Sequence, residues 1–274
     1  MNIRQSDNQV HYENDSLEVG YMTYLNSEVF YRKLPPDSCR LHRMHPRNMA
    51  LAVEQGDIHA GPLPVAEVMR LNGTVRSLGD LGVACDGAAM SVFVFSHYPI
   101  KELSGKRIAV TSHTATSIQL LRILLADLWD VTGHEFVTMS DTYDAALVIG
   151  DPALELLHQG GFRHHYDLGT AWKNLTGLPF VFAEWVIRSD VRPARANEFA
   201  DQLLSATHAG LNSIPEIQAA RSDEVMTSSE IAKYVRNFTY FIGEPERAGQ
   251  QEFKRRLGQL QDWRPTMHKP ISAM

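Results

Sequence analysis

The chain has 274 residues, of which 44% are hydrophobic and 21% are charged. These values are typical of a globular protein that can bury a full core, and the length predicts two domains or one domain of two lobes. The formal net charge of −6 argues against a nucleic-acid partner, because such proteins carry a basic surplus that neutralises phosphates.

The first sixteen residues, "MNIRQSDNQVHYENDS", are polar and lack the apolar stretch of a secretory signal. No later segment approaches the ~18 uninterrupted apolar residues of a membrane span. We therefore expect a disordered leader over residues 1–16, a cytoplasmic location and no membrane partner. Cys39 and Cys85 are too few for a disulfide framework, so we expect reduced thiols.

The twelve histidines form neither an HExxH array nor a cluster flanked by CxxC. His164 and His165 are adjacent, so their side chains would point apart in a helix or a strand. The spacing predicts no metal site.

Short apolar runs alternate with helical patterns along the first two thirds of the chain. Pro and Gly punctuate these patterns at positions where helices begin or end. Strands are expected at 17–22, near 39–44, before Gly61, in two pieces within 82–96, at 106–110, after 144 and at 177–188. Helices are expected at 27–34, 46–56, before Gly73, over about 116–128, after Gly150, and at 193–211, 215–221, 227–242 and 245–262.

This alternation predicts an α/β protein with parallel sheets, with the helical tail covering the first sheet. The Pro-containing link 96–105 and the long strand 179–188 are the expected crossings between two lobes. Lobe boundaries follow at 17–96 plus 189–274 for the first lobe and 97–188 for the second.

Small hydroxylated residues gather in "VTSHTATSIQLL", at the entry to the long helix expected from about residue 116. They are Thr111, Ser112, Thr114, Thr116 and Ser117. One such residue would simply cap the helix, but five exceed what capping requires. The N-terminus of a helix favours anions, so the cluster is a candidate site for a carboxylate or phosphate.

Asn26, Gly150 and Asp151 stand at the ends of expected strands, immediately before a helix, whereas Ser91 opens an apolar strand and Thr176 precedes one. In open α/β sheets, ligands bind beyond the carboxyl ends of the strands, where the first three residues are expected. Each also has a purely structural alternative, as a cap, a turn or a hydroxyl satisfied inside a sheet. No GxSxG, GxGxxG or GxxxxGK[ST] motif occurs, so a hydrolase elbow and nucleotide loops have no support.

Six segments stand in a recognisable order: "YLNS", "GDIHAGPLPVAEVM", "CDGAAMSVFVFS", "TSHTATSIQLLRILL", "ALVIGDPAL" and "DLGTAWKNLTGLPFVFAEW". From about Val19 to Arg188 the chain resembles the chorismate dehydratase family of the futalosine route to menaquinone. The resemblance implies a two-lobed fold like the type II periplasmic binding proteins, with the ligand between the lobes. It also implies removal of water from chorismate to give 3-[(1-carboxyvinyl)oxy]benzoate, without a metal or an organic cofactor.

The resemblance assigns the chemistry to the Asn of "LN" and the Ser of the "CDG…S" strand, which are Asn26 and Ser91. It assigns carboxylate binding to Thr116 and Ser117, and organisation of the cleft to Asp151. The remaining substrate contacts expected here are Ser112, Thr114, Gly150 and Thr176.

The chain departs from many relatives at Glu28-Val29, where a Pro is common, at Ala88, another common Pro, and at Ala115, where many have a cation. Two alternatives to the dehydratase remain open. One is the sister enzyme 1,4-dihydroxy-6-naphthoate synthase, although its usual Ser-Pro-Cys-Pro-type segment is missing. The other is a cytoplasmic protein of the same fold that binds or senses a small carboxylate. The sequence does not indicate an oligomeric state.

Overall fold

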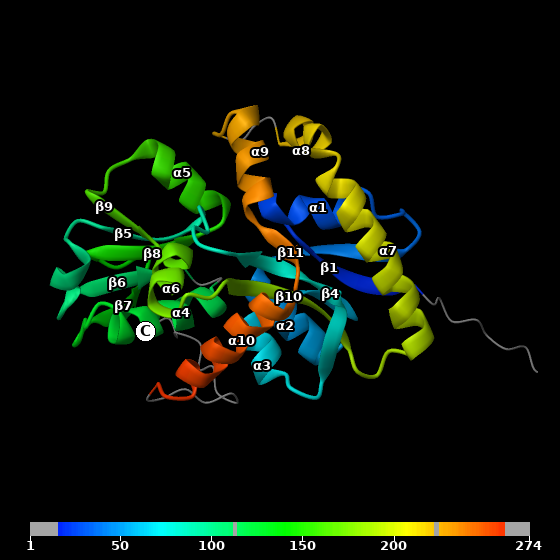
Figure 1. Ribbon diagram of the computed structural model, residues 1–274, viewed down its shortest axis with the longest axis horizontal. Coiled ribbons are helices and arrows are strands. Elements are labelled where there is room, and N and C mark those ends of the chain that lie inside the picture. The colour runs from blue at the N-terminus through cyan, green and yellow to red at the C-terminus, as the bar shows by residue number, and fades with distance from the viewer. Residues whose placement is uncertain (1–15, 112–113, 222–224, 261–274) are drawn as a thin grey trace, which may run out of the picture.

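The computed structural model describes residues 16–111, 114–221 and 225–260 (Figure 1). The leader expected at 1–16 lies outside the described residues except for Ser16. No helix in the described part of the chain is long and apolar enough to span a bilayer.

Two separate sheets divide the molecule into two lobes (Figure 1). Lobe 1 is built on a six-stranded sheet of order β11-β4-β10-β3-β1-β2, and lobe 2 on a five-stranded sheet of order β7-β6-β8-β5-β9. The lobe 1 strands are β1 (Leu17–Met22), β2 (Cys39–Met44), β3 (Ala60–Pro64), β4 (Val75–Cys85), β10 (Phe180–Arg188) and β11 (Thr239–Phe241). The lobe 2 strands are β5 (Val92–Ser96), β6 (Arg107–Val110), β7 (Glu135–Thr138), β8 (Ala145–Ile149) and β9 (His164–Asp167).

Helices cover both sheets. Lobe 1 carries η1 (Leu25–Ser27), α1 (Glu28–Tyr31), α2 (Pro46–Gln55), α3 (Val65–Arg70), α7 (Pro193–Leu211), α8 (Ile214–Ala220), α9 (Ser228–Asn237) and α10 (Glu244–Leu257). Lobe 2 carries η2 (Ile100–Leu103), α4 (Thr116–Asp127), α5 (Asp151–Gln159) and α6 (Leu168–Thr176). The C-terminal helices α7 and α10 pack on strands of lobe 1, as expected for the tail.

Local sequence signals explain several of these boundaries. Helix α2 has Pro46 in its first turn and ends at Gly56, whose φ of 85° suits glycine. Helix α9 begins with a capping box, in which Thr227 and Glu230 each bond the other's backbone N–H. The apolar strand β10 is almost fully buried because β3 and β4 flank it and helices cover it.

The sheets are mixed, so the expectation of purely parallel sheets was wrong. Strands β1, β2 and β3 are parallel, as are β6, β7 and β8, but β10 and β5 run antiparallel to their neighbours. A strand that arrives from the other lobe enters its sheet at the cleft and runs away from it. Its direction is therefore opposite to that of strands whose carboxyl ends point at the cleft.

The crossings lie earlier in the chain than expected. β4 ends at Cys85 in lobe 1 and β5 already belongs to lobe 2, so the first crossing is the segment 86–91 and not 96–105. The whole of β10 belongs to lobe 1, so the second crossing is 177–179. The sequence misled here because the second half of β4 and the whole of β5 are apolar, and apolarity does not identify a strand's partner.

Several elements were missed or misjudged. The strands β7, β9 and β11 and helix α6 were not predicted, and the helix expected over 227–242 ends at Asn237, before β11. β7, β9 and β11 have only three or four residues each, which is too short for a clear alternating pattern.

The two lobes are in contact. A single cluster of buried apolar residues includes Val94 and Leu120 of lobe 2 together with Trp185 and Tyr234 of lobe 1. Helix α10 also reaches lobe 2, where Arg256 pairs with Asp127 of α4. The lobes are therefore closed on each other in this structure.

Candidate functional site

A small cavity of about 70 Å³ lies between the lobes. It is bounded by the segments that follow β1, β3 and β8, by the start of β5, by the N-terminus of α4, and by β10. Its lining consists of Met22, Tyr24, Asn26, Pro46, Pro64, Val83, Ser91, Val92, Thr114, Ala115, Thr116, Ser117, Ile149, Gly150, Phe182, Ala183 and Phe238. Ligand sites usually enclose about 300 Å³ or more, so a ring-sized ligand requires the lobes to separate.

Asn26 lies in η1, directly after β1, and is 9% exposed. Its Oδ1 accepts a hydrogen bond from Ser27 Oγ (3.2 Å), and its side chain caps neither η1 nor α1. Within the described residues no partner is seen for its Nδ2, which leaves an amide donor for a ligand. The capping alternative is therefore not what the structure shows.

Ser91 lies at the end of the first crossing and is 2% exposed. Its Oγ accepts a hydrogen bond from the hydroxyl of Tyr234 (2.7 Å). Its carbonyl accepts from the N–H of Gly150 (2.8 Å), which ties the start of β5 to the end of β8. The preceding residue, Met90, has a φ of 62°, and its N–H donates to the Asp167 carboxylate (2.7 Å).

The N-terminus of α4 also faces the cavity. The helix is twelve residues long, and no side chain caps its first turn. Thr116 Oγ1 instead accepts from the N–H of Ala66, across the cleft (3.2 Å), and Ser117 is buried in the lining. Thr114 is 7% exposed and its Oγ1 has no partner among the described residues. The expected Ser112 lies outside the described residues.

Gly150 ends β8 with a φ of 69° and a ψ of −149°. A Cβ there would lie 2.7 Å from the ring of Tyr24, so glycine lets the two lobes approach. Asp151 does not line the cavity. Its Oδ1 accepts from the N–H of Leu25 (3.1 Å), and its Oδ2 pairs with Arg221, so this carboxylate links lobe 2 to lobe 1.

Thr176 is not part of the cavity. Its hydroxyl donates to the carbonyl of Trp172 (2.9 Å) and accepts from the N–H of Leu178 (3.1 Å) at the end of α6. The prediction placed Thr176 before a strand because α6 was not foreseen. In the structure this hydroxyl is satisfied within its own helix end.

Sequence reasoning missed three aromatic residues of the lining: Tyr24, Phe182 and Phe238. Burial, with a smaller effect of the Asp151 charge, raises the pKa of Tyr24 to about 12, so its phenol stays protonated at neutral pH. Tyr24 stands two residues before Asn26, and that proximity was the available signal. Phe182 lies inside the apolar run of β10 and carries no distinguishing signal.

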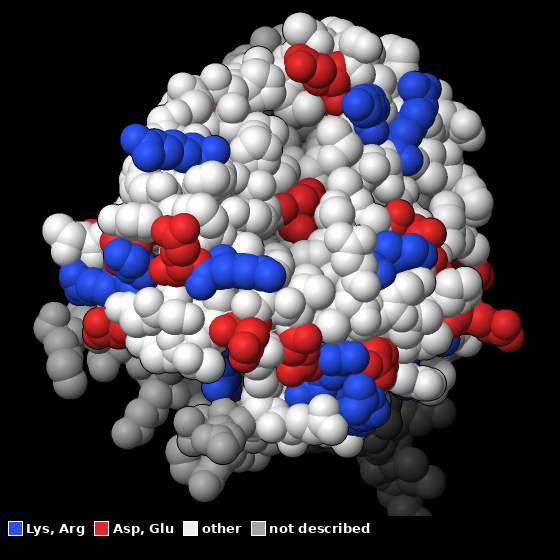
Figure 2. Space-filling view, turned by 60° about the vertical axis from the view of Figure 1, so that its left-hand side comes forward, with Lys and Arg blue, Asp and Glu red and all other residues white. Residues whose placement is uncertain are grey.

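No charged side chain occurs among the described residues that line the cavity. Its electrostatics therefore come from the α4 dipole and from neutral hydroxyl and amide donors. In the described part of the chain no group of three or more His, Cys, Asp or Glu is placed to hold a metal ion. On the face shown in Figure 2, basic and acidic side chains are interspersed, with no continuous basic surface.

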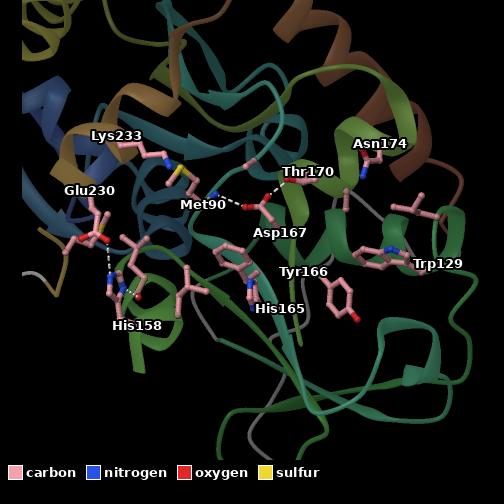
Figure 3. A pocket seen from close by; sticks show the side chains of 17 residues that line it. Met90, Trp129, His158, His165, Tyr166, Asp167, Thr170, Asn174, Glu230 and Lys233 are labelled. Carbon is pink, nitrogen blue, oxygen red and sulfur yellow. Dashed lines mark hydrogen bonds and ion pairs between the residues drawn. The ribbon is translucent and has the colours of Figure 1, made fainter. Parts of the chain in front are cut away.

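Three larger hollows open elsewhere on the surface. One, of about 590 Å³, lies behind the crossing 86–91, where Asp167 bonds Met90 and Thr170 (Figure 3). The second, of about 690 Å³, borders Asp151 and Arg221, and the third, of about 320 Å³, borders Arg188. None of the three is lined by Asn26, Ser91 or the start of α4, so the small interlobe cavity is the candidate site.

Comparison with known families decides the affiliation. A family model described as menaquinone biosynthesis matches residues 17–259. The chain belongs to this menaquinone biosynthesis family. The affiliation agrees with the resemblance inferred from the sequence motifs.

Two curated proteins related to this menaquinone biosynthesis chain have enzyme names. The chorismate dehydratase of Thermus thermophilus is 26% identical over 260 residues, covering 88% of this chain and 94% of the relative. The 1,4-dihydroxy-6-naphthoate synthase of Streptomyces coelicolor is 26% identical over 159 residues, covering 52% of this chain and 56% of the relative.

Solved structures confirm the expected fold. A protein of Archaeoglobus fulgidus superposes with a TM-score of 0.74 at 15% identity, covering 90% of this chain and 98% of the other. The periplasmic aliphatic sulphonate binding protein of Escherichia coli gives a TM-score of 0.60 at 15% identity, with coverage of 90% and 88%. This member of the menaquinone biosynthesis family therefore has the two-lobed α/β fold of periplasmic binding proteins.

Proposed function

We propose that the chain is a chorismate dehydratase, a hydro-lyase that forms 3-[(1-carboxyvinyl)oxy]benzoate in the futalosine route to menaquinone. The observation that carries the proposal is the interlobe cavity. It brings the Asn26 amide, the Ser91 hydroxyl and the start of α4 into one lining with no charged side chain among its described residues.

The reaction is a redox-neutral elimination. The C3–H bond of chorismate breaks, its electron pair forms the C3=C4 double bond, and the C4–O bond breaks. The proton and the hydroxide together leave as one water molecule, and the ring becomes aromatic. Because aromatisation provides a large driving force, the protein needs to supply positioning and electrostatic preorganisation rather than a strong acid or base. We propose that no metal or organic cofactor takes part.

The anionic groups of chorismate match the start of α4. We propose that Thr114, Thr116 and Ser117, together with the free N–H groups of the first turn, hold one carboxylate. Thr114 is the best supported of the three, because its buried Oγ1 has no protein partner in the described residues. An unsatisfied buried hydroxyl costs free energy unless a ligand completes it.

Asn26 and Ser91 are placed to hold the enolpyruvyl arm or the leaving hydroxyl. Both are neutral, so they can donate hydrogen bonds without competing for the proton. We propose that a carboxylate of the substrate itself accepts the C3 proton. The same proposal places the enzyme in the cytoplasm, with chorismate as its small-molecule partner.

The first prediction concerns Asn26 and Ser91. Purified protein incubated with chorismate should consume its ultraviolet diene absorbance and give a product lighter by one water in the mass spectrum. Asn26→Ala and Ser91→Ala should each lower kcat by about a hundredfold or more, the usual effect of removing one preorganised donor. Melting curves would check that both variants remain folded.

Thr176→Val provides the matched control. Like Ser91→Ala it removes a side-chain hydroxyl, but Thr176 lies outside the cavity. Its kcat should equal that of the unaltered chain. A folded protein that leaves chorismate intact would refute the proposed function, and full activity of Asn26→Ala would refute the assigned site.

The naphthoate synthase is the second candidate, since the Streptomyces relative matches half of the chain. Inactivity on chorismate, together with 1,4-dihydroxy-6-naphthoate formed from a cell extract that supplies the pathway intermediates, would favour it. Calorimetric binding of chorismate without turnover would instead indicate a sensor of small carboxylates.

A further inference from the structure

Tyr234 of α9 reaches Ser91 from behind the cavity. Its hydroxyl donates to Ser91 Oγ at 2.7 Å, and the two side chains are 0% and 2% exposed. Tyr234 does not line the cavity itself. Its hydrogen bond therefore acts on Ser91 and not on a ligand.

The direction of this bond determines what Ser91 can offer. A hydroxyl has one hydrogen to donate and two lone pairs to accept. When Tyr234 occupies one lone pair, the hydrogen of Ser91 remains available. The acceptor that the protein offers it, the carbonyl of Ala89, lies 3.5 Å away, at the outer limit of a hydrogen bond. The Ser91 hydrogen is thus free for an acceptor in the cavity.

Both partners are held firmly. The ring of Tyr234 packs edge-on against Phe238, with centroids 5.2 Å apart. One turn along α9, Asn237 Nδ2 donates to the carbonyl of Ala88 (2.7 Å). From the other side, Asp167 accepts the N–H groups of Ala89 and Met90, the latter bond visible in Figure 3. The segment that carries Ser91 is therefore clamped between α9 and the start of α6.

Burial keeps this phenol in its donor form. The complete burial of Tyr234 raises its pKa well above the ordinary value, because a phenolate is disfavoured away from water. The hydroxyl is protonated throughout the neutral range.

We propose that Tyr234 is a positioning residue, which donates to Ser91 Oγ and so presents the Ser91 hydroxyl to the substrate as a hydrogen-bond donor. This inference rests on the proposed dehydratase function and adds a role for α9 in it. If Ser91 donated to Tyr234 instead, it could only accept from the substrate, and a leaving hydroxyl needs a donor.

Tyr234→Phe removes the hydroxyl and keeps the ring. We expect kcat on chorismate to fall about tenfold while KM stays within twofold. Substrate binding is retained, and only the orientation of the Ser91 hydroxyl is lost. Tyr240→Phe is the matched control. Tyr240 is 1% exposed and its hydroxyl donates to the carbonyl of Val235 (3.0 Å), so the variant loses a comparable buried bond that does not involve Ser91. Its kcat should not change.

A double variant separates positioning from a general structural role. In the Ser91→Ala background, adding Tyr234→Phe should leave kcat unchanged, because the Ser91 hydroxyl that Tyr234 orients is already absent. A further loss of the same size as in the unaltered background would overturn the proposal. If Tyr234→Phe alone is insoluble, the kcat values of Ser91→Ala and the double variant still test the positioning role. The double variant removes both hydrogen-bond partners and leaves no hydroxyl unsatisfied.

The outcomes also separate this inference from the proposed function. Failure of the unaltered protein to convert chorismate refutes the function, whatever Tyr234 does. Conversion by the unaltered protein with equal kcat values for Tyr234→Phe and Tyr240→Phe refutes the positioning role alone. If Ser91→Ala has no measurable turnover, the positioning role is tested by comparing kcat and KM between Tyr234→Phe and Tyr240→Phe.

Discussion

Asn26 and Thr114 both keep unused hydrogen-bonding capacity, although each residue is more than nine-tenths buried. The Oγ1 of Thr114 is a buried atom without a partner among the described residues, and no bond of the Asn26 Nδ2 is seen in that part of the chain. Folded proteins normally satisfy such groups, because an unpaired buried donor costs about 1 to 3 kcal/mol. Because both residues also line the interlobe cavity, this unused capacity is the residue-level signature of the proposed binding site.

Thr114→Val tests that signature directly. The variant replaces an unsatisfied hydroxyl by a methyl group of similar shape, so the free energy of unfolding should stay level or rise by about 1 kcal/mol. Loss of a bond to a charged carboxylate should raise KM for chorismate about tenfold. Urea unfolding and steady-state kinetics measure the two effects.

Thr207→Val is the control for Thr114→Val, since Thr207 is fully buried and its Oγ1 donates to the carbonyl of Leu203 (2.7 Å). It should keep its KM and lose about 1 kcal/mol of stability. A lower stability of Thr114→Val with an unchanged KM would contradict a binding role for Thr114.

At the residue scale the sequence was informative where a motif was available. Asn26 and Ser91 were chosen by resemblance, and both line the cavity. Thr176 was chosen by its place next to a predicted strand, and its hydroxyl is used up within α6. Composition cannot distinguish a threonine that bonds its own helix from one that faces a ligand, because the difference lies in what surrounds it.

At the scale of elements, the turn from β8 into α5 determines how closely the lobes approach. Gly150 occupies this turn and the Tyr24 ring from lobe 1 rests against it. Helix α5 then starts with Asp151 and Pro152, as Gly-Asp-Pro predicts. The glycine therefore serves both the backbone conformation and the contact between lobes.

Gly150→Ala should destabilise the protein through two separate effects. The backbone strain of a non-glycine residue costs about 1 to 3 kcal/mol, and overpacking against Tyr24 adds a similar amount. Gly160→Ala isolates the first effect, because Gly160 has nearly the same φ and ψ, 72° and −156°, with no atom within 4 Å of its Cβ position. Equal losses for both variants in urea unfolding would show that Tyr24 imposes no constraint.

Elements with strong local signals were predicted and weak ones were not. The helix expected at 193–211 is α7 at those residues, and α2 begins and ends at its Pro and Gly. The three-residue strand β11 was instead assigned to the end of a helix. A strand that short is defined by its bonds to β4, so its own sequence contains too little information.

At the scale of the whole molecule, Asp151 and Arg221 form a link between the lobes. Asp151 receives the Leu25 N–H and the Arg221 guanidinium, and Arg221 also contacts Glu28 (3.4 Å) and the carbonyl of Thr23 (3.0 Å). Both partner side chains are only 16% exposed. Such a network has to break when the lobes separate to admit a ligand.

Asp151→Ala should therefore shift the protein towards an open form. We expect a larger radius of gyration in small-angle X-ray scattering and a loss of about 2 kcal/mol of stability, the usual worth of hydrogen bonds to a charged group. Glu216→Ala is the control, because it removes an exposed ion pair with Lys33 inside lobe 1. If both variants scatter alike, the link does not hold the lobes together.

The sequence by itself determined the α/β class, the family motifs, the main helix boundaries and six of the seventeen described residues that line the cavity. These depend on local signals: hydrophobic period, caps, Pro and Gly positions, and short sequence motifs. Only the tertiary structure decided where the chain crosses between lobes, which strands run antiparallel, and which hydroxyls remain unpaired. Those properties depend on contacts between segments far apart in the chain, such as Tyr234 with Ser91, and no local pattern encodes a distant partner.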